Sequence, residues 1–150
     1  SKETGGESFY AQLAEVPQIK DFYFAIIDRN KALDEGGILD DTPPFSQSLV
    51  KPSMANLNRY AYVEISFEQP TKVGFNLKFE VAWIPDGSTQ EQIIKKDIVA
   101  VREGAQSASL DFRNLDGDAK TATTLLQKGT YVVKLYNGRQ VMGEGQFLAR

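Results

Sequence analysis

The stretch LLQKGTYVVKLYNGRQVMGEGQFL, from Leu125 to Leu148, decides the fold. Two runs rich in β-branched and aromatic residues, 131–136 and 141–148, flank the dipeptide Asn137-Gly138. This dipeptide readily supplies the two positive φ angles of a type I′ turn. The stretch therefore predicts two antiparallel strands that form a closing hairpin.

Five further runs upstream have the alternation or the β-rich composition of strands. The clearest alternation is in 73–83, where Val73, Phe75, Leu77, Phe79, Val81 and Trp83 share one face. The other four runs are 21–27, 60–67, 93–101 and 107–112. Seven strands and no long helix predict an all-β fold, an antiparallel β-sandwich.

Two segments outside these strands stand apart. Residues 1–20 are predicted to be an N-terminal tail, in which Phe9, Leu13 and Val16 have helical spacing and Pro17 ends a short helix. The domain is predicted to cover 21–150. Residues 28–59 form a long connection after the first strand, and their apolar residues predict that much of the connection packs on the sandwich.

Leu126, Gly129 and Tyr131 stand where immunoglobulin-like sandwiches form a tyrosine corner. With the hairpin, these residues make the chain similar to the bacterial immunoglobulin-like domains of cell-envelope and secreted proteins. The resemblance implies that Val133, with Val63 or Ile65, occupies the positions of the family's two disulfide cysteines. It also implies a periplasmic or extracellular location, whose targeting signal is absent from a chain that starts at Ser1.

Composition excludes several classes of function. The chain has no histidine and no cysteine, which removes the usual catalytic triads and thiolate or imidazole metal sites. Its 17 basic and 20 acidic residues include no basic cluster, so we expect no nucleic-acid partner. Its apolar runs are too short to cross a bilayer, and no cofactor is expected.

Acidic residues gather in the connections predicted for one pole of the sandwich. They include Asp86, Asp116 and Asp118, which are a weak calcium candidate because hard cations need six to eight oxygen ligands. The spacing lacks the pattern of an EF-hand, so the favoured interpretation is a solvated acidic pole without a metal.

Glu64 and Glu80 look like a carboxylate pair in the sequence. The fold places their strands in opposite sheets, so they cannot act together on a glycosidic bond. The chain is therefore predicted not to be an enzyme.

Tyr60 and Tyr62 share the outward face of one strand, and Tyr23 is expected beside them if the first two strands pair. Such tyrosines bind protein partners or stack on sugars. The favoured alternative is that residues 28–59 cover them, with Phe45 and Leu49 packed there. Tyr23, Tyr60, Tyr62 and Phe45 are the candidate ligand or partner residues.

Gly143 and Gly145 fall on the inward parity of the last strand. Two missing side chains indicate a β-bulge or the close approach of another backbone, such as the N-terminal segment. A groove that accepts an added strand is the less favoured alternative. The sequence as a whole predicts a non-catalytic protein-interaction or structural module, with carbohydrate binding as the alternative.

Overall fold

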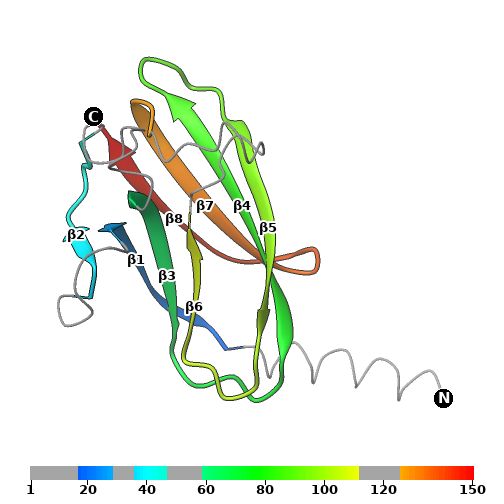
Figure 1. Ribbon diagram of the computed structural model, residues 1–150. Helices are drawn as coiled ribbons and strands as arrows, with labels where there is room; N and C mark the ends of the chain where they lie inside the picture. The colour runs from blue at the N-terminus through cyan, green and yellow to red at the C-terminus, as the bar shows by residue number, and fades with distance from the viewer. Residues whose placement is uncertain (1–16, 29–35, 47–58, 112–125) are drawn as a thin grey trace, which may run out of the picture.

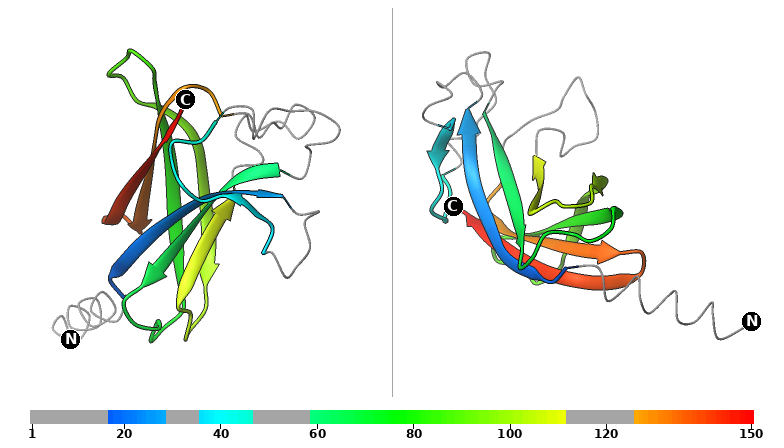
Figure 2. Two further views of the ribbon diagram at one scale, coloured as in Figure 1. Left: turned by 90° about the vertical axis from the view of Figure 1, so that its left-hand side faces the viewer. Right: turned by 90° about the horizontal axis from the view of Figure 1, so that it is seen from below.

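Two antiparallel sheets pack face to face in the computed structural model, which describes residues 17–28, 36–46, 59–111 and 126–150 (Figures 1 and 2). Within these residues the strand order is β2-β1-β3-β6 in one sheet and β5-β4-β7-β8 in the other. The strands are β1 (Ile19–Asp28), β2 (Ile38–Asp40), β3 (Arg59–Phe67), β4 (Phe75–Pro85), β5 (Gln92–Val101), β6 (Ser107–Asp111), β7 (Gly129–Asn137) and β8 (Gln140–Ala149).

This order is that of an immunoglobulin-like sandwich. β8, β7 and β4 occupy the positions of strands G, F and C, and β5 extends that sheet as an additional strand. β1, β3 and β6 occupy the positions of A, B and E. The predicted all-β class is confirmed, and all seven predicted strands are present.

Alternation along the strands determines which side chains fill the space between the sheets. On β3, Val63 and Ile65 are fully buried, and on β4 the same is true of Leu77 and Phe79. Val133 on β7 is also fully buried, as the resemblance implied. Each of these side chains belongs to one continuous apolar core, which is the largest stabilising contribution to such a fold.

Tyr131 ties the start of β7 to the chain before it. Its hydroxyl accepts a hydrogen bond from the Gln127 N–H at 2.8 Å and donates one to the Gln127 carbonyl at 3.1 Å. Its ring stacks on Phe147, with centroids 5.0 Å apart and planes at 5°. These hydrogen bonds are those of a tyrosine corner, as the spacing predicts.

The same hydroxyl makes stability depend on alkaline pH. Burial raises the pKa of Tyr131 to about 12, whereas the ordinary value is 10.0. Because the folded-state pKa lies above the unfolded one, this contribution is complete below about pH 10 and is lost as the pH rises toward about 12.

Wild-type protein should therefore lose about 2–3 kcal/mol more unfolding free energy than Tyr131→Phe across this window. Urea titrations of both proteins at several alkaline pH values measure the difference. Lysines and the other tyrosines titrate in both proteins, so their effects cancel. Parallel pH profiles for the two proteins would contradict the assignment of this pH dependence to the Tyr131 hydroxyl.

The closing hairpin is confirmed, but its turn is shifted by one residue. Asn137 pairs with Gln140, so the two central residues are Gly138 and Arg139. Gly138 has a φ of 62°, and no described residue other than glycine has a positive φ. One positive φ at the first central position is typical of a type II′ turn, so the predicted type I′ turn is wrong.

The connection after β1 packs on the sandwich in its described part. β2 adds a three-residue strand beside β1, which was not predicted. Phe45 then forms a parallel bridge with Ala149, since the Phe45 N–H donates to the Leu148 carbonyl and the Arg150 N–H donates to the Phe45 carbonyl, both at 2.9 Å. This segment covers the end of the β8 edge. Phe9, Leu13, Val16 and Leu49 lie outside the described residues.

Gly143 and Gly145 make room for the first strand of the opposite sheet. A Cβ atom on Gly145 would lie 2.7 Å from the Phe22 ring, and one on Gly143 would lie 3.3 Å from Ile19. The β7–β8 register also shifts between Leu135 and Tyr136, which confirms the predicted bulge. The close approach is made by side chains of β1 rather than by its backbone. Phe22 therefore occupies the space over Gly145 that a groove for an added strand would need.

Thr71 joins two connections at one pole of the sandwich. The β3–β4 and β5–β6 connections lie side by side there, at the bottom of Figure 1. The Thr71 hydroxyl donates to the Arg102 carbonyl at 2.6 Å and accepts from the Ala105 N–H at 3.1 Å. Its side chain is buried, so both bonds are shielded from water. The sequence offered no signal for this contact.

Thr71→Val should lower the free energy of unfolding by about 1–3 kcal/mol, because the Arg102 carbonyl and the Ala105 N–H lose their bonds to the hydroxyl and keep only the 3.2 Å bond to each other. Thr71→Ser keeps the hydroxyl and serves as the matched control. Chemical denaturation of the three proteins measures the effect, and no loss for valine beside a clear loss for serine would show that the methyl group, not the hydrogen bonds, matters.

Candidate functional site

The outer surface of the β1-β3-β6 layer carries the tyrosines singled out in the sequence. Tyr23 pairs with Glu64 and Glu64 with Ser109, so these three residues form one row across three strands. Tyr62 pairs with Ala25 in the next row, diagonal to Tyr23. We call the surface formed by Tyr23, Tyr62, Glu64 and Ser109 the tyrosine face.

The tyrosine face is acidic and partly buried. Burial raises the pKa of Tyr23, and the nearby carboxylates of Asp41 and Glu64 raise it further. Burial also raises the pKa of Tyr62, although a hydrogen bond with Ser109 lowers it. Asp41 lies just after β2, so the connection that follows β1 contributes a charge to the rim of this face.

Tyr60 and Phe45 do not belong to the accessible part of this face. Tyr60 pairs with Ile27 one row beyond Tyr62, but only 7% of it is exposed. Phe45 is 1% exposed and packs against Phe147 with ring centroids 5.5 Å apart, in the core. The predicted ligand role of Phe45 is therefore corrected: a ring enclosed between the sheets cannot meet a ligand on the outer surface.

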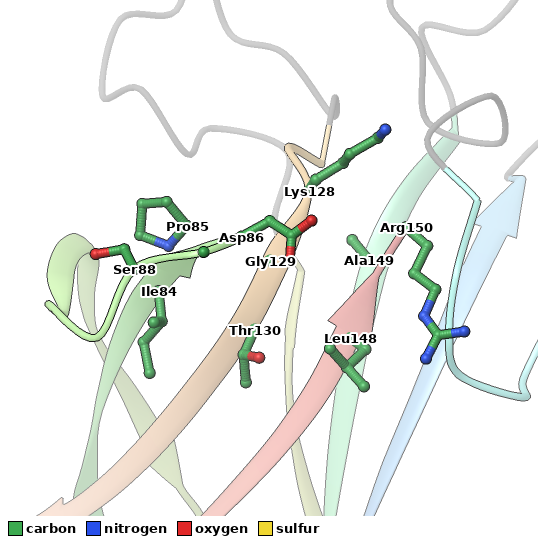
Figure 3. A pocket seen from close by; sticks show the side chains of 11 residues that line it. Ile84, Pro85, Asp86, Ser88, Lys128, Gly129, Thr130, Leu148, Ala149 and Arg150 are labelled. Carbon is green, nitrogen blue, oxygen red and sulfur yellow. The ribbon is translucent and has the colours of Figure 1, made fainter.

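Asp86 lies in a hollow at the pole where β4 and β8 end and β7 begins (Figure 3). The hollow has a volume of about 450 Å³, and its charged lining residues are Asp86, Lys128 and Arg150. We call it the pole hollow. The sequence predicted an acidic pole and did not predict these two cations. Their positive charges disfavour a calcium ion beside Asp86.

The other members of the predicted acidic sites are separated or fall outside the described residues. Asp116 and Asp118 lie outside the described residues, so the calcium candidate is not tested there. Glu64 is on β3 and Glu80 on β4, in opposite sheets as predicted. The pair cannot flank one substrate bond.

Comparisons with known proteins give fold-level likeness at low identity. No protein-family model matches the chain, and no curated protein does. An immunoglobulin-like protein from Pseudomonas aeruginosa is 11% identical with a TM-score of 0.47, over 89% of this chain and 95% of that one. Two larger proteins also align: a β-D-glucoside glucohydrolase from Trichoderma reesei and the β-glucosidase D2-BGL from Chaetomella raphigera.

The glucohydrolase is 11% identical with a TM-score of 0.36, over 87% of this chain and 19% of that one. The β-glucosidase is 12% identical with a TM-score of 0.34, over 85% and 18%. The chain thus spans about a fifth of each of these two enzymes. A search of the described residues for a helix long and apolar enough to cross a membrane finds none.

Proposed function

We propose that this chain is a non-catalytic protein-interaction module and that the tyrosine face is its binding surface. The observation that carries the proposal is that Tyr23 and Tyr62 are diagonal neighbours on the outer surface of one sheet, beside Glu64. Tyrosine provides a large contact area at low conformational entropy cost and keeps a polar end for hydrogen bonding.

Charge favours a particular kind of protein partner. Glu64 and Asp41 both raise the pKa of Tyr23, so two carboxylates act on one ring. A lysine or arginine of the partner would pair with these carboxylates and lie over the tyrosine ring. The proposed partner therefore presents a basic side chain within an apolar contact.

The proposal includes no catalysis. The complete sequence has no histidine and no cysteine, and the two glutamates that resemble a carboxylate pair face away from each other on opposite sheets. A screen for glycosidase, esterase and peptidase turnover tests this part. Turnover that survives purification and is abolished by Glu64→Gln would overturn it.

We also propose a bacterial envelope or secreted context, with a periplasmic or extracellular location. Its support is the resemblance carried by Leu126, Gly129 and Tyr131, to which the structure adds the hydrogen bonds between Tyr131 and Gln127. Immunodetection of the full-length protein in fractionated source cells tests the location. Recovery in the cytosolic fraction alone would refute it.

Site-specific photo-crosslinking tests the binding surface. A photoreactive phenylalanine analogue at Tyr23 should capture a defined partner from envelope extract, whereas the same analogue at Tyr136 on the opposite sheet should not. Tyr23→Ala with Tyr62→Ala should weaken binding of the purified partner by about tenfold or more. Tyr136→Ala is the matched control, and equal losses for both would refute the assignment.

Carbohydrate binding is the second candidate function. The row Tyr23, Glu64 and Ser109 places an aromatic ring beside hydrogen-bond acceptors, which is the combination that sugar hydroxyls and ring faces require. A glycan array probed with wild-type protein and with Tyr23→Ala distinguishes the two functions. Glycan binding lost in the variant, without crosslinking to a protein, would favour the second candidate.

A further inference from the structure

The outer surface of the β5-β4-β7-β8 sheet carries most of the large apolar side chains that are exposed to water. Within the described residues, four of the five exposed large hydrophobic residues belong to this sheet: Ile93, Ile98, Val141 and Leu148. Ile98 and Val141 are 63% and 59% exposed. Apolar side chains gathered on one face of a protein are typical of an interaction surface.

The strand register brings part of this surface into one row across all four strands. Lys78 pairs with Ile98 on one side and with Tyr136 on the other, and Tyr136 pairs with Val141. Paired residues of antiparallel strands project from the same face, and this face is the outer one because the residues before and after Lys78 are buried in the core. The Lys78 Nζ atom lies 5.8 Å from the centre of the Tyr136 ring. We call these four residues the apolar row, to which Lys78 contributes its aliphatic stem.

The next row on the same surface consists of charges that alternate in sign. Glu80 pairs with Lys96 and with Lys134, and Lys134 pairs with Glu144. From β5 to β8 the signs are therefore positive, negative, positive and negative. The Lys134 Nζ atom also lies 3.0 Å from a carboxylate oxygen of Glu91, an ion pair that holds the lysine at this surface. We call Lys96, Glu80, Lys134 and Glu144 the charged row.

The charged row determines how a second copy of the chain fits this surface. Two identical faces meet about a two-fold axis that lies in the plane between them. An axis across the strands, along the charged row, would place each charge on its own copy, so that Lys96 would face Lys96. An axis parallel to the strands, between β4 and β7, instead places β5 on β8 and β4 on β7 of the second copy. Lys96 then faces Glu144 of the second copy. Glu80 likewise faces Lys134, so every charge of the row meets an opposite charge.

The apolar row is complementary to itself about the same axis. Ile98 faces Val141 of the second copy, so the two most exposed side chains of the surface cover each other. We propose that two copies of this chain associate through the outer faces of their β5-β4-β7-β8 sheets, about a two-fold axis parallel to the strands.

The size of the surface sets the expected strength of this dimer. Four strands about 4.8 Å apart and about eight residues long span on the order of 500 Å² per copy. This area is at the low end for a specific interface, so the dimer is weak, with a dissociation constant on the order of 10 µM or above. The tyrosine face lies on the other sheet and stays uncovered in each copy.

Sedimentation velocity of the purified protein, from about 5 to about 500 µM, tests the proposal. The average mass should rise with concentration from that of one chain toward that of two. Lys96→Glu alone and Glu144→Lys alone should each weaken association about tenfold or more, because like charges then face each other across the axis. Lys96→Glu combined with Glu144→Lys should restore it, since opposite charges face each other again with their signs exchanged.

The double variant separates association from the stability of one chain. Within one copy it has like charges side by side on β5 and β4 and again on β7 and β8, which disfavours the fold. Restored association therefore cannot come from better folding, and circular dichroism checks that each variant is folded. Ile98→Glu should abolish the dimer. Ile38→Glu, at an exposed isoleucine of the other sheet, is the matched control and should preserve it.

Three results would overturn the proposal. The first is a mass of one chain at every concentration. The second is a double variant that associates no more strongly than the two single variants, which would exclude the parallel axis. The third is an equal loss for Ile98→Glu and Ile38→Glu. None of these results affects the tyrosine face. A photoreactive analogue at Tyr136 should join two copies of this chain in the concentrated protein, a product recognised by its doubled mass.

Discussion

Replacing Gly129 with alanine should reduce the free energy of unfolding by about 3–5 kcal/mol, a large effect for the addition of a single methyl group. A Cβ atom at this position would collide with the Ile84 carbonyl and lie 2.7 Å from Trp83 Nε1. The φ angle of Gly129 is 143°, a value that residues with a side chain rarely adopt. The neighbouring atoms are backbone and a hydrogen-bonded ring, so neither can move aside cheaply.

Gly138→Ala is the matched control. Gly138 also has a positive φ, 62°, but a Cβ atom there would meet nothing within 4 Å. It should lose only about 1–2 kcal/mol from backbone strain. Chemical denaturation of both variants measures the difference, and similar losses would mean that close contact at Gly129 is unimportant.

Phe45→Ala should destabilise the protein by about 3–5 kcal/mol, the usual effect of emptying a buried aromatic site. Phe45 is 1% exposed and forms an aromatic cluster with Phe147, which itself lies 5.0 Å from Phe24. The residue belongs to a connection outside the main strands. The prediction therefore tests whether this connection is an integral part of the core.

Ile98→Ala on β5 provides the comparison, because Ile98 is 63% exposed and its truncation should change stability by about 0.5 kcal/mol or less. Thermal and urea unfolding would measure both variants. A loss below about 1 kcal/mol for Phe45→Ala would mean that the core closes without this ring.

The strand framework was predictable because one physical rule decides it locally. Where one face of a strand meets the core, apolar side chains recur at every second position, as Val63, Ile65, Leu77 and Phe79 do. Tyr131 added a long-range clue, since its spacing from Gly129 specifies how β7 starts. The pairing of Tyr23 with the β3 strand followed from the same framework.

Contacts between distant segments were not predictable in the same way. β2 has three residues, too few to show alternation, and the packing of Phe45 depends on a bridge to Ala149. Thr71 is one of many threonines until its partners at 102–105 are known. Each of these features depends on how the two sheets are placed, which composition does not encode.

The pole hollow was missed although part of its signal was present. Counting outward from Asn137 and Gln140 and allowing for the bulge pairs Gly129 with Ala149, and Lys128 and Arg150 are the residues that follow this pair at the end of the hairpin. The acidic residues in the nearby connections led instead to the prediction of an acidic pole. Charge in a loop is informative only after the strand register shows which residues stand opposite each other.

The chain enters its first strand at one pole and leaves its last strand at the other, since β1 starts at the bottom of Figure 1 and β8 ends at the top. Tension applied between residues 17 and 150 would act along the strands. The ladder between β1 and β3 would then be loaded in shear, so that many hydrogen bonds must break together rather than one after another. We therefore expect this arrangement to resist extension, with Phe22 on β1 packed against Gly145 on β8 as a contact between the two sheets.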